Sequence, residues 1–293
     1  MTDDTISAPD RLRALLDGQG LIVMPCCFDP LSAKLIEQAG FPLTFMSGFA
    51  VSATRLGMPD TGLISYGEIV DQGRNICSAV GIPVIGDGDT GYGNALNVKR
   101  TVKGYADAGF AAVMIEDQVA PKRCGHTQGK SVVSRSEAYE RIRAAVDARA
   151  EGKDILILAR TDARHEYGLG EAIERAPHFR ELGADILFVE APRDESEMRE
   201  LCDMLEGPKM ANMVEGGLTP NLSPDELEAI GFKIAAYPLT LMSAAMKAMV
   251  DTLAELRAGK VSPDRLMSFI EIEERVGFLD YFDEEKRYAD LRA

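Results

Sequence analysis

Two aspartates and a glutamate stand directly after short apolar runs of this 293-residue chain. Asp87 and Asp89 form the sequence Asp-Gly-Asp after one run, and Glu116 ends another. Carboxylate oxygens combined with water molecules suit Mg²⁺ or Mn²⁺, which use few protein ligands. A turn would also explain Asp-Gly-Asp, because both residue types are common in turns, but it would not explain Glu116. The pattern therefore favours a divalent-cation site.

Residues that bind anions follow other apolar runs. Arg160 suits a bidentate contact with a carboxylate, and the alternative is an arginine paired with Asp162 or Glu190 in a structural ion network. The pair Ser47-Gly48 offers a hydroxyl and unblocked backbone N–H groups to anionic oxygens, and its alternative is a plain strand-to-helix turn. These residues predict a site for an acidic small molecule.

The segment 121–126 has the sequence Pro-Lys-Arg-Cys-Gly-His and no strand pattern. Nearby positive charge lowers the pKa of a thiol, which would make proton transfer by Cys124 practical near neutral pH. An inert, buried cysteine is the alternative, and the charged neighbours disfavour it. The remaining cysteines are assigned to packing, and they are Cys26, Cys27, Cys77 and Cys202.

These residues need a scaffold that brings the ends of separate strands together. Eight short apolar runs recur along the chain, as expected for strands buried on both faces of a parallel sheet. Amphipathic segments such as 101–108 and 135–150 lie between them. Gly40, Gly109 and Gly183 follow helical patterns and suit helix ends. The apolar runs are 21–24, 43–46, 84–86, 112–115, 155–159, 186–189, 209–211 and 233–236.

Eight alternating strand and helix units predict an α/β protein, a (β/α)8 barrel with its chemistry at the carboxyl ends of the strands. A doubly wound open sheet is the alternative, but no Gly-x-Gly-x-x-Gly follows the first run. Two more helical patterns, 239–258 and 262–276, exceed the needs of a barrel. Their apolar faces must be buried on the barrel or on another subunit, and Met242, Met246 and Met249 indicate core or interface packing there.

The charge balance excludes several classes of partner. Lys plus Arg is 32 and Asp plus Glu is 47, giving a net charge of −15, and such a chain repels nucleic-acid phosphates. No apolar run approaches the ~20 residues of a membrane helix, and the acidic start lacks the features of a signal peptide. The cysteines and histidines show neither a disulfide framework nor zinc spacing. We expect a reduced, cytoplasmic protein with no nucleic-acid or membrane partner.

Three motifs together resemble those of the isocitrate lyase/phosphoenolpyruvate mutase superfamily. They are Lys-Arg-Cys-Gly-His at 122–126, Asp-Gly-Asp-Thr-Gly at 87–91 and Ala-Arg-Thr-Asp at 159–162. The resemblance extends over most of the chain, from about residue 10 to about residue 285. The Lys-Arg-Cys-Gly-His run is specific to the lyase branch of this superfamily.

The resemblance implies a TIM-type barrel over residues 1–240 with a gating loop at 118–134. A helical extension of the same domain is expected over residues 241–293. In this superfamily the last helices are exchanged between paired subunits, so we expect a homotetramer built from helix-swapped dimers.

The resemblance also implies which residues form the site. The metal is expected to be Mg²⁺, or Mn²⁺, with Asp87 as its direct ligand and further carboxylates holding its waters. Cys124 corresponds to the general acid on the gating loop, with Arg160 and His126 as further catalytic groups. The further carboxylates are Asp60, Asp89 and Glu116. The substrate-binding positions are Phe45, Ser47, Gly48, Phe49, Lys122, Gly125, Glu190, Asn212 and Pro238.

Two groups of lyases compete within the branch. The run 211–220 and the segments 47–53 and 56–60 resemble 2,3-dimethylmalate lyases and plant 2-alkylmalate lyases more than 2-methylisocitrate lyases. Oxaloacetate-cleaving members tend to have a serine near the end of the last strand, where this chain has Pro238. Some members have a tyrosine where this chain has Phe45, so the general base is left unassigned.

The resemblance therefore implies an enzyme that cleaves a carbon–carbon bond of a 2-hydroxy dicarboxylate. The products would be an α-keto acid such as pyruvate and a fragment that Cys124 protonates to a carboxylic acid. Candidate substrates are 2,3-dimethylmalate, a 2-alkylmalate and 2-methylisocitrate. The alternatives are an oxaloacetate decarboxylase or hydrolase, a carboxyvinyl-carboxyphosphonate phosphorylmutase-like enzyme and a non-catalytic metabolite-binding barrel.

Overall fold

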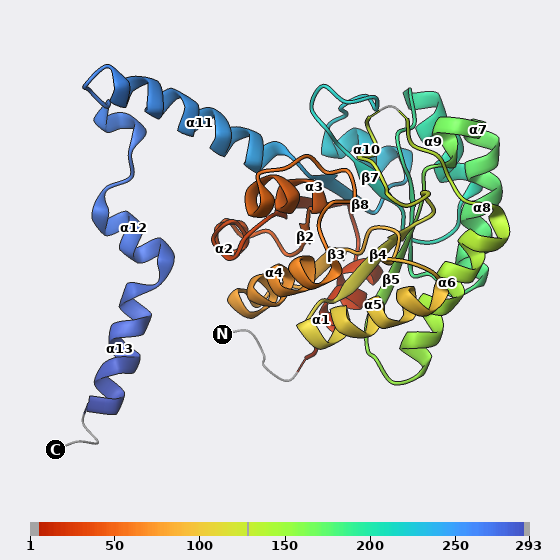
Figure 1. Cartoon of the computed structure of the whole chain (residues 1–293), viewed down its shortest axis with the longest axis horizontal. Coiled ribbons are helices and arrows are strands. Elements are labelled where there is room, and N and C mark those ends of the chain that lie inside the picture. Colours follow the sequence, from red (N-terminus) through yellow and green to blue (C-terminus); the bar gives the residue numbers. More distant parts are fainter. Residues whose placement is uncertain (1–5, 128, 290–293) are drawn as a thin grey trace. The chain divides into compact units, whose positions relative to one another are not determined.

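The structure is a computed structural model that describes residues 6–127 and 129–289. Backbone contacts divide the chain into two compact units, Met1–Leu241 and Met242–Ala293, and each is described by itself (Figure 1). Whether both units count as one domain stays a prediction of the sequence.

Eight parallel strands form the centre of the first unit, which confirms the barrel prediction. Their order is β6-β5-β4-β3-β2-β1-β8-β7, and a parallel bridge between Leu187 and Lys209 joins β6 to the start of β7. The sheet therefore comes round to a nearly closed barrel. The strands are β1 Ile22–Cys27, β2 Thr44–Met46, β3 Val84–Asp87, β4 Ala112–Glu116, β5 Leu156–Thr161, β6 Ile186–Val189, β7 Met210–Asn212 and β8 Ile234–Tyr237.

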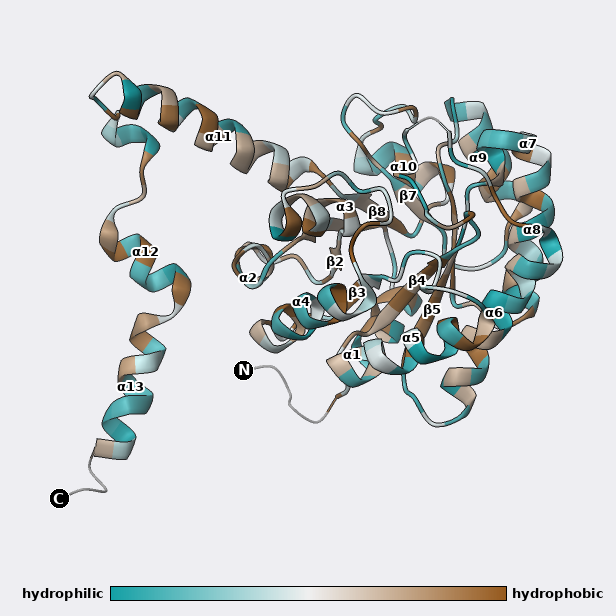
Figure 2. Ribbon diagram, viewed as in Figure 1, coloured by the Kyte–Doolittle hydropathy of each residue, from teal (hydrophilic) through white to brown (hydrophobic). Residues whose placement is uncertain are grey.

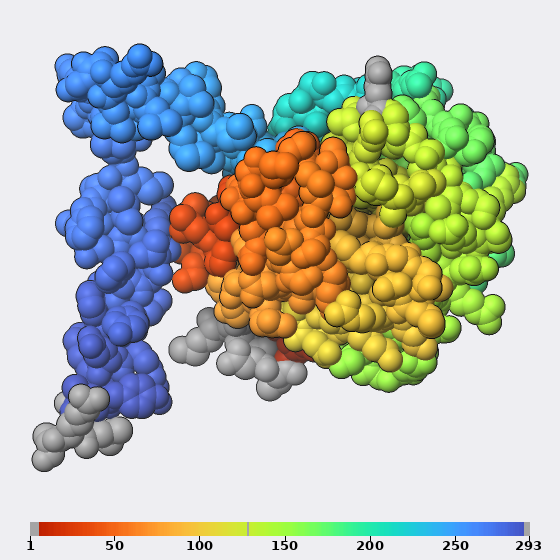
Figure 3. Space-filling view, viewed as in Figure 1, coloured from red at the N-terminus to blue at the C-terminus, as the bar shows by residue number. Residues whose placement is uncertain are grey.

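Helices cover the outside of these strands (Figure 1). The strands are mostly hydrophobic, whereas the outer faces of the helices are largely hydrophilic (Figure 2). Residues of α4 and α5, orange and yellow in Figure 3, form much of the face turned toward the viewer. The helices are α1 Ala8–Asp17, α2 Pro30–Gln38, α3 Gly48–Val51, η1 Ser52–Leu56, α4 Tyr66–Ala79, α5 Ala95–Ala108, α6 Arg135–Ala150, α7 Ala163–Tyr167, α8 Leu169–Glu181, α9 Glu195–Met204 and α10 Pro224–Ile230.

Two apolar layers hold the strands in place. One fills the barrel with inward-facing side chains such as Met24, and the other packs between strands and helices. Gly86 of β3 lies against Tyr105, whose ring stacks on Phe110 with 4.7 Å between centroids. An added Cβ at Gly86 would lie 2.6 Å from the Tyr105 ring. Close packing therefore fixes the end of β3, next to Asp87.

The predicted glycine helix ends are confirmed. Gly40, Gly109 and Gly183 have φ angles of +86°, +97° and +107°, a region that glycine adopts without a steric penalty. A helix that the apolar pattern does not predict, α1, begins after Ser7. Local residues mark the start of this helix. The Ser7 side chain accepts a hydrogen bond from the N–H of Asp10, and a proline stands in the first turn.

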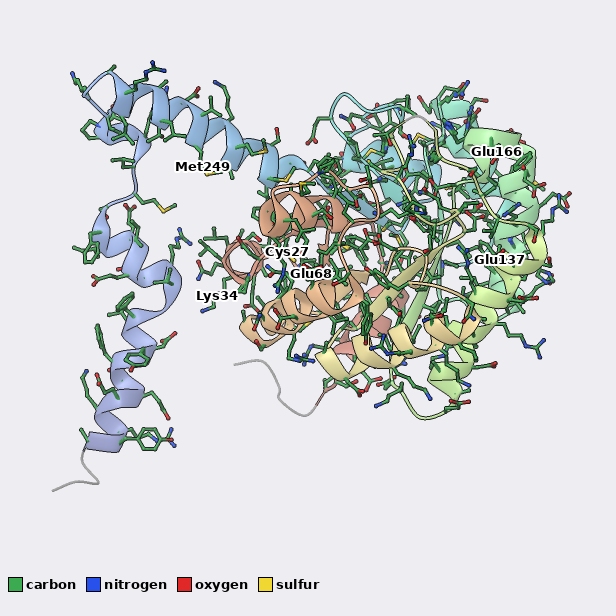
Figure 4. The ribbon with its side chains drawn as sticks, viewed as in Figure 1. Cys27, Lys34, Glu68, Glu137, Glu166 and Met249 are labelled. Carbon is green, nitrogen blue, oxygen red and sulfur yellow. The ribbon has the colours of Figure 1, made fainter. Side chains whose placement is uncertain are left out.

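The second unit is helical over its described residues. The patterns predicted at 239–258 and 262–276 correspond to the first and second of its α-helices. The third lies in neither pattern but within the helical extension expected over residues 241–293. Met242 is buried, but Met246 and Met249 are 52% and 57% exposed, and Met249 is labelled in Figure 4. No helix within residues 6–127 and 129–289 is long and apolar enough to cross a membrane. The elements are α11 Thr240–Arg257, which begins in the first unit, η2 Pro263–Arg265, α12 Phe269–Val276 and α13 Phe278–Ala289.

Candidate active site

The carboxyl ends of the strands surround one cavity of the barrel unit. It encloses about 570 Å³ of empty space, its opening included, and sites for small molecules have roughly 300–1,000 Å³. The predicted site residues that line it are Cys124, Arg160, His126, Phe45, Ser47, Phe49, Lys122, Gly125, Glu190, Asn212, Pro238, Asp87 and Asp60. The other predicted site residues, Gly48, Asp89 and Glu116, are not part of the lining and contact it through their neighbours.

The carboxylates predicted to hold a metal gather around Lys122. Its Nζ lies 2.7 Å from Asp60 Oδ2 and 2.8 Å from Asp89 Oδ1. Asp87 accepts hydrogen bonds from the N–H groups of Gly48 and Asp89. The three carboxylates and the lysine are all buried, so their charges act on one another with little screening by water.

Two of the acids predicted to hold the metal or its waters, Asp89 and Glu116, resist losing their protons. Burial raises the pKa of Asp89 to about 6, and repulsion from Asp87 and Asp60 adds to the rise although Lys122 opposes it. Burial also raises the pKa of Glu116 well above its ordinary value. One oxygen of Asp60 and one of Glu116 are buried without a hydrogen-bond partner among the described residues. Raised pKa values and unpartnered oxygens mark a place where an added cation is stabilising.

This donor set fits a hard divalent cation that keeps water ligands. Among the residues that the structure describes, no three His, Cys, Asp or Glu side chains could hold a metal ion by themselves. Mg²⁺ usually binds through one or two carboxylates and retains several waters. Asp87 lines the cavity and is placed to be such a ligand, and Asp60 lines the same cavity.

Arg160 is bound by three carboxylates. Its Nε and Nη2 lie 2.8 and 3.0 Å from Asp162, its Nε lies 3.3 Å from Glu116, and its Nη2 lies 3.1 Å from Glu190. Burial alone would raise the pKa of Asp162, but Arg160 and Lys130 outweigh burial and lower it. The ion network that the sequence left as an alternative is therefore present, and Arg160 lines the cavity as well.

The Cys-Gly-His motif closes one side of the cavity. An added Cβ at Gly125 would lie 2.5 Å from both Arg160 Nη2 and Glu190 Oε2, so a larger residue does not fit. His126 Nε2 lies 3.2 Å from Glu190 Oε1, and Asn212 Nδ2 donates to Glu190 Oε2 at 3.2 Å. Glu190, directly after β6, thus joins residues from β5, β7 and the loop. Burial would raise the pKa of Glu190, but Arg160 and His126 outweigh burial and lower it to about 2.

The pKa of the Cys124 thiol differs from the predicted one. Burial raises its pKa, and the negative charges of Glu190 and Asp60 add to the rise, whereas the His126 N–H and Arg160 oppose it. The prediction that adjacent cations lower this pKa is wrong, because acids share the cavity with the thiol and burial dominates. A thiol with a raised pKa stays protonated near neutral pH, which suits a proton donor.

The turn at Ser47 and Gly48 is also used differently. The Ser47 side chain caps α3 by accepting a hydrogen bond from the N–H of Ala50. The N–H of Gly48, predicted to bind an anionic ligand, donates to Asp87 Oδ2 at 3.2 Å. The strand-to-helix turn given as the alternative is therefore present. Ser47 also lines the cavity, and substrate binding by these two residues stays a prediction.

Two buried arginines hold the base of the loop at 118–134. The two ends of the loop pair in a short antiparallel ladder. Arg141 of α6 donates to the carbonyl of Gln118 at 2.7 Å, and Arg175 of α8 donates to the carbonyl of Val133 at 2.9 Å. Both ends are thereby fixed to the outer layer of helices.

The apolar floor of the cavity is missing from the prediction. Met114, Phe188 and Met210 each lie two positions before a strand-end polar residue, and side chains two apart on a strand face the same side. That period would have identified them. Lys130, whose Nζ lies 2.7 Å from Asp162 Oδ1, is also missed, and no sequence pattern links these two residues. The lining residues that were not predicted are Cys26, Met114, Arg123, Phe188, Met210, Val214, Ala236 and Leu239.

The chain matches the phosphoenolpyruvate phosphomutase family over residues 12–257. A 2,3-dimethylmalate lyase of Eubacterium barkeri is 43% identical, with 96% of this chain and 98% of the relative covered. A chloroplastic carboxyvinyl-carboxyphosphonate phosphorylmutase of Arabidopsis thaliana is 42% identical, with 100% and 88% covered. A 2-methylisocitrate lyase of Aeropyrum pernix is 41% identical, with 96% and 90% covered.

Solved structures agree with these sequence matches. An oxaloacetate acetylhydrolase with 3,3-difluorooxalacetate gives a TM-score of 0.92 at 36% identity, with 97% of both chains covered. A 2,3-dimethylmalate lyase gives 0.92 at 35% identity, with 97% and 96% covered. A phosphonopyruvate hydrolase with oxalate and Mg²⁺ gives 0.86 at 32% identity, with 97% and 100% covered.

Fold and sequence therefore agree on a class of (β/α)8 enzymes. The chain belongs to the phosphoenolpyruvate mutase/isocitrate lyase superfamily. Relatives that are named as lyases support the lyase interpretation, and phosphorylmutase and acetylhydrolase relatives are found in the same superfamily.

Proposed function

We propose that this protein is a carbon–carbon lyase that cleaves a 2-hydroxy dicarboxylate to an α-keto acid and a carboxylic acid. The observation that carries the proposal is that Cys124, whose pKa burial raises, lines one cavity with Arg160 and Asp87. Polar groups at the strand ends would bind the acid groups of the substrate. The apolar floor would accept its carbon chain.

The chain's own residues supply binding, orientation and a proton. Arg160, Ser47 and Asn212 would bind a substrate carboxylate by charge and hydrogen bonds. When the carbon–carbon bond breaks, the thiol of Cys124 would donate its proton to the carbon that is left with the electron pair. The loop at 118–134 would exclude water, which competes as a proton source.

We propose Mg²⁺, or Mn²⁺ in its place, as the resident metal. Asp87 would hold the ion directly, while Asp60, Asp89 and Glu116 would hold its waters. When bound, the ion supplies positive charge that stabilises the oxygen from which the hydroxyl proton is lost. Titration with Mn²⁺, followed by its electron paramagnetic resonance signal, tests this without turnover. Asp87→Asn should weaken binding, and equal binding would contradict the assignment.

The function is tested by assaying pyruvate release from 2,3-dimethylmalate, 2-alkylmalates, 2-methylisocitrate and isocitrate with Mg²⁺ present. Cys124→Ser should lower kcat by a factor of about 10² to 10⁴, the usual contribution of a general acid. Cys202→Ser on α9, outside the cavity lining, is the matched control and should keep full activity. Undiminished kcat in the Cys124 variant would refute the proton-donor role.

Oxaloacetate cleavage is the second candidate, because an oxaloacetate acetylhydrolase has the same fold at 36% identity. Pro238, where oxaloacetate-cleaving members tend to have serine, disfavours it. Release of oxalate and acetate, or of CO₂, from oxaloacetate would detect this activity. Activity on oxaloacetate that survives Cys124→Ser, together with none on the 2-hydroxy acids, would replace the lyase proposal.

We further propose that the protein assembles as a homotetramer of helix-swapped dimers in the cytoplasm. The second unit supports the assembly, because its helices expose many large apolar side chains, such as Leu253 and Ile270. Sedimentation analysis of the full chain gives the mass directly. A monomer at micromolar concentration would contradict this part of the proposal.

A further inference from the structure

Two segments that follow different strands meet at the ring of His126. One is the loop that bears Cys124, and the other follows β7. The N–H of Leu218 donates a hydrogen bond to His126 Nδ1 at 3.1 Å, while His126 Nε2 lies 3.2 Å from Glu190 Oε1. A ring nitrogen that accepts a hydrogen bond carries no proton. The ring proton is therefore on Nε2 and is directed at Glu190.

Hydrogen bonds within the barrel unit fix the segment after β7, which binds the His126 ring. The N–H of Gly217 donates to the carbonyl of Val214 at 2.9 Å and closes a turn. Gly216 in this turn has φ of +74°, as a turn with glycine at its third position requires. Glu215 accepts a hydrogen bond from the Thr240 hydroxyl at 2.5 Å. The turn is thus fixed to the barrel unit independently of the loop.

Gly217 leaves just enough room for the histidine ring. An added Cβ would lie 2.7 Å from His126 Nδ1 and 3.0 Å from Val214 Cβ. The φ angle of Gly217 is not in the left-handed region, so glycine is not needed there for its backbone conformation. The missing side chain provides clearance for the ring.

We propose that the Gly217–Leu218 peptide is a latch for the catalytic loop. It holds the His126 ring with Nε2–H on Glu190, and so it keeps Cys124, two residues earlier in the chain, inside the cavity. Gly217 and Leu218 are positioning residues in this role. The consequence for catalysis rests on the proposed lyase function, whereas the latch itself is a property of the protein without substrate.

Limited digestion with a lysine-specific endoprotease measures the latch without turnover, because such a protease does not cleave after the exposed Arg123 of the loop. Lys122 and Lys130 lie in the loop and are buried, so cleavage after them requires the loop to leave the cavity. Gly217→Ala should speed this cleavage about fivefold to tenfold, because cleavage follows the population of the open form and one hydrogen bond with its packing is lost. Gly170→Ala is the matched control, since an added Cβ there meets nothing within 4 Å, and it should cleave like wild type.

A double substitution separates the histidine contact from the contact with Val214. His126→Ala alone removes the latch, so adding Gly217→Ala to it should change the cleavage rate no further. If the added substitution speeds cleavage as much in the His126→Ala protein as in wild type, the effect comes from Val214 and the latch is wrong. A Gly217→Ala protein that is cleaved at the wild-type rate would also overturn the latch proposal.

Two further measurements connect the latch to the site. With ring ¹⁵N labelling, His126 should show a protonated Nε2 and an unprotonated Nδ1, and a proton on Nδ1 would overturn the proposal. In the lyase assay, Gly217→Ala should lower kcat more than it raises KM, because the groups that hold the substrate acid remain in place. A wild-type protein without lyase activity, but with the expected cleavage pattern, would contradict the proposed function and leave the latch standing.

Discussion

The mouth of the barrel and the helices of the second unit differ in which side chains they expose to water. At the mouth, charged side chains are buried and paired, and Arg160 is only 8% exposed. In the second unit, large apolar side chains face water, with Leu253 at 64% and Phe269 at 72% exposed. Buried charges are stable only with partners inside the same fold, whereas an exposed apolar surface is stabilised by covering it. The charges of the first region have their partners within the barrel unit, whereas the large apolar side chains of the second unit are not covered within that unit.

The largest effect is expected when one buried charge is removed from the mouth of the barrel. Arg160→Met leaves Asp162, Glu116 and Glu190 without their shared cation, and breaking such a buried network costs about 3–5 kcal/mol. The free energy of unfolding from urea titration measures the loss. Arg193→Met changes an exposed arginine and should stay within about 0.5 kcal/mol of wild type. Equal stability of the two variants would mean that the network is not essential to the fold.

The second region is tested by making its apolar surface polar. Leu253→Ser combined with Phe269→Ser should raise the subunit dissociation constant at least about tenfold, because covering each large side chain contributes about 1.5–3 kcal/mol. Sedimentation velocity over a dilution series measures it. Lys286→Ser, at a charged and exposed site, should leave association unchanged. An unchanged mass in the double variant would show that this surface is not used for assembly.

A smaller change tests the packing that fixes the end of β3. Gly86→Ala places a Cβ 2.6 Å from the Tyr105 ring, and overpacking of this kind costs about 1–3 kcal/mol. Urea unfolding measures the cost, with Gly170→Ala as the control. A variant as stable as wild type would show that Tyr105 and Phe110 move easily and that the strand end is less rigid than described.

The smallest effect concerns an ion pair outside the cavity. A hydrogen bond from Arg135 lowers the pKa of Glu171 to about 2, and Arg175 adds to the effect. Because the folded-state pKa lies below the ordinary value, this pair stabilises fully above about pH 4.5 and the stabilisation is lost as the pH falls through about 2. The stability difference between wild type and Glu171→Gln should therefore shrink by about 1–2 kcal/mol from pH 7 to pH 3.

The control for that pH dependence is Glu174→Gln, which changes a more exposed carboxylate on the same arginine. It should show little change between the two pH values, because exposed ion pairs contribute about 0–1 kcal/mol. A pH-independent difference for Glu171→Gln would mean that Arg135 does not hold this carboxylate in solution.

The strands and the side chains at their ends follow from the sequence because both depend on local periodicity. Asp87, Glu116 and Arg160 stand where apolar runs stop, and parallel strands bring those ends together. The partners of these groups do not follow, because they come from distant parts of the chain. The pairing of Lys130 with Asp162 joins residues 32 positions apart, and the raised pKa of Cys124 depends on acids from other strands.

The two arginines at the base of the loop bind main-chain carbonyls. Glu166 on α7, labelled in Figure 4, likewise accepts a hydrogen bond from the main-chain N–H of Val132. Such contacts do not depend on which side chains the intervening stretch bears. Substitutions in that stretch can therefore change the cavity while both attachment points stay where they are, provided that Lys122 and Lys130 keep their buried aspartate partners. A barrel built in this way can acquire new chemistry through the other positions of the loop.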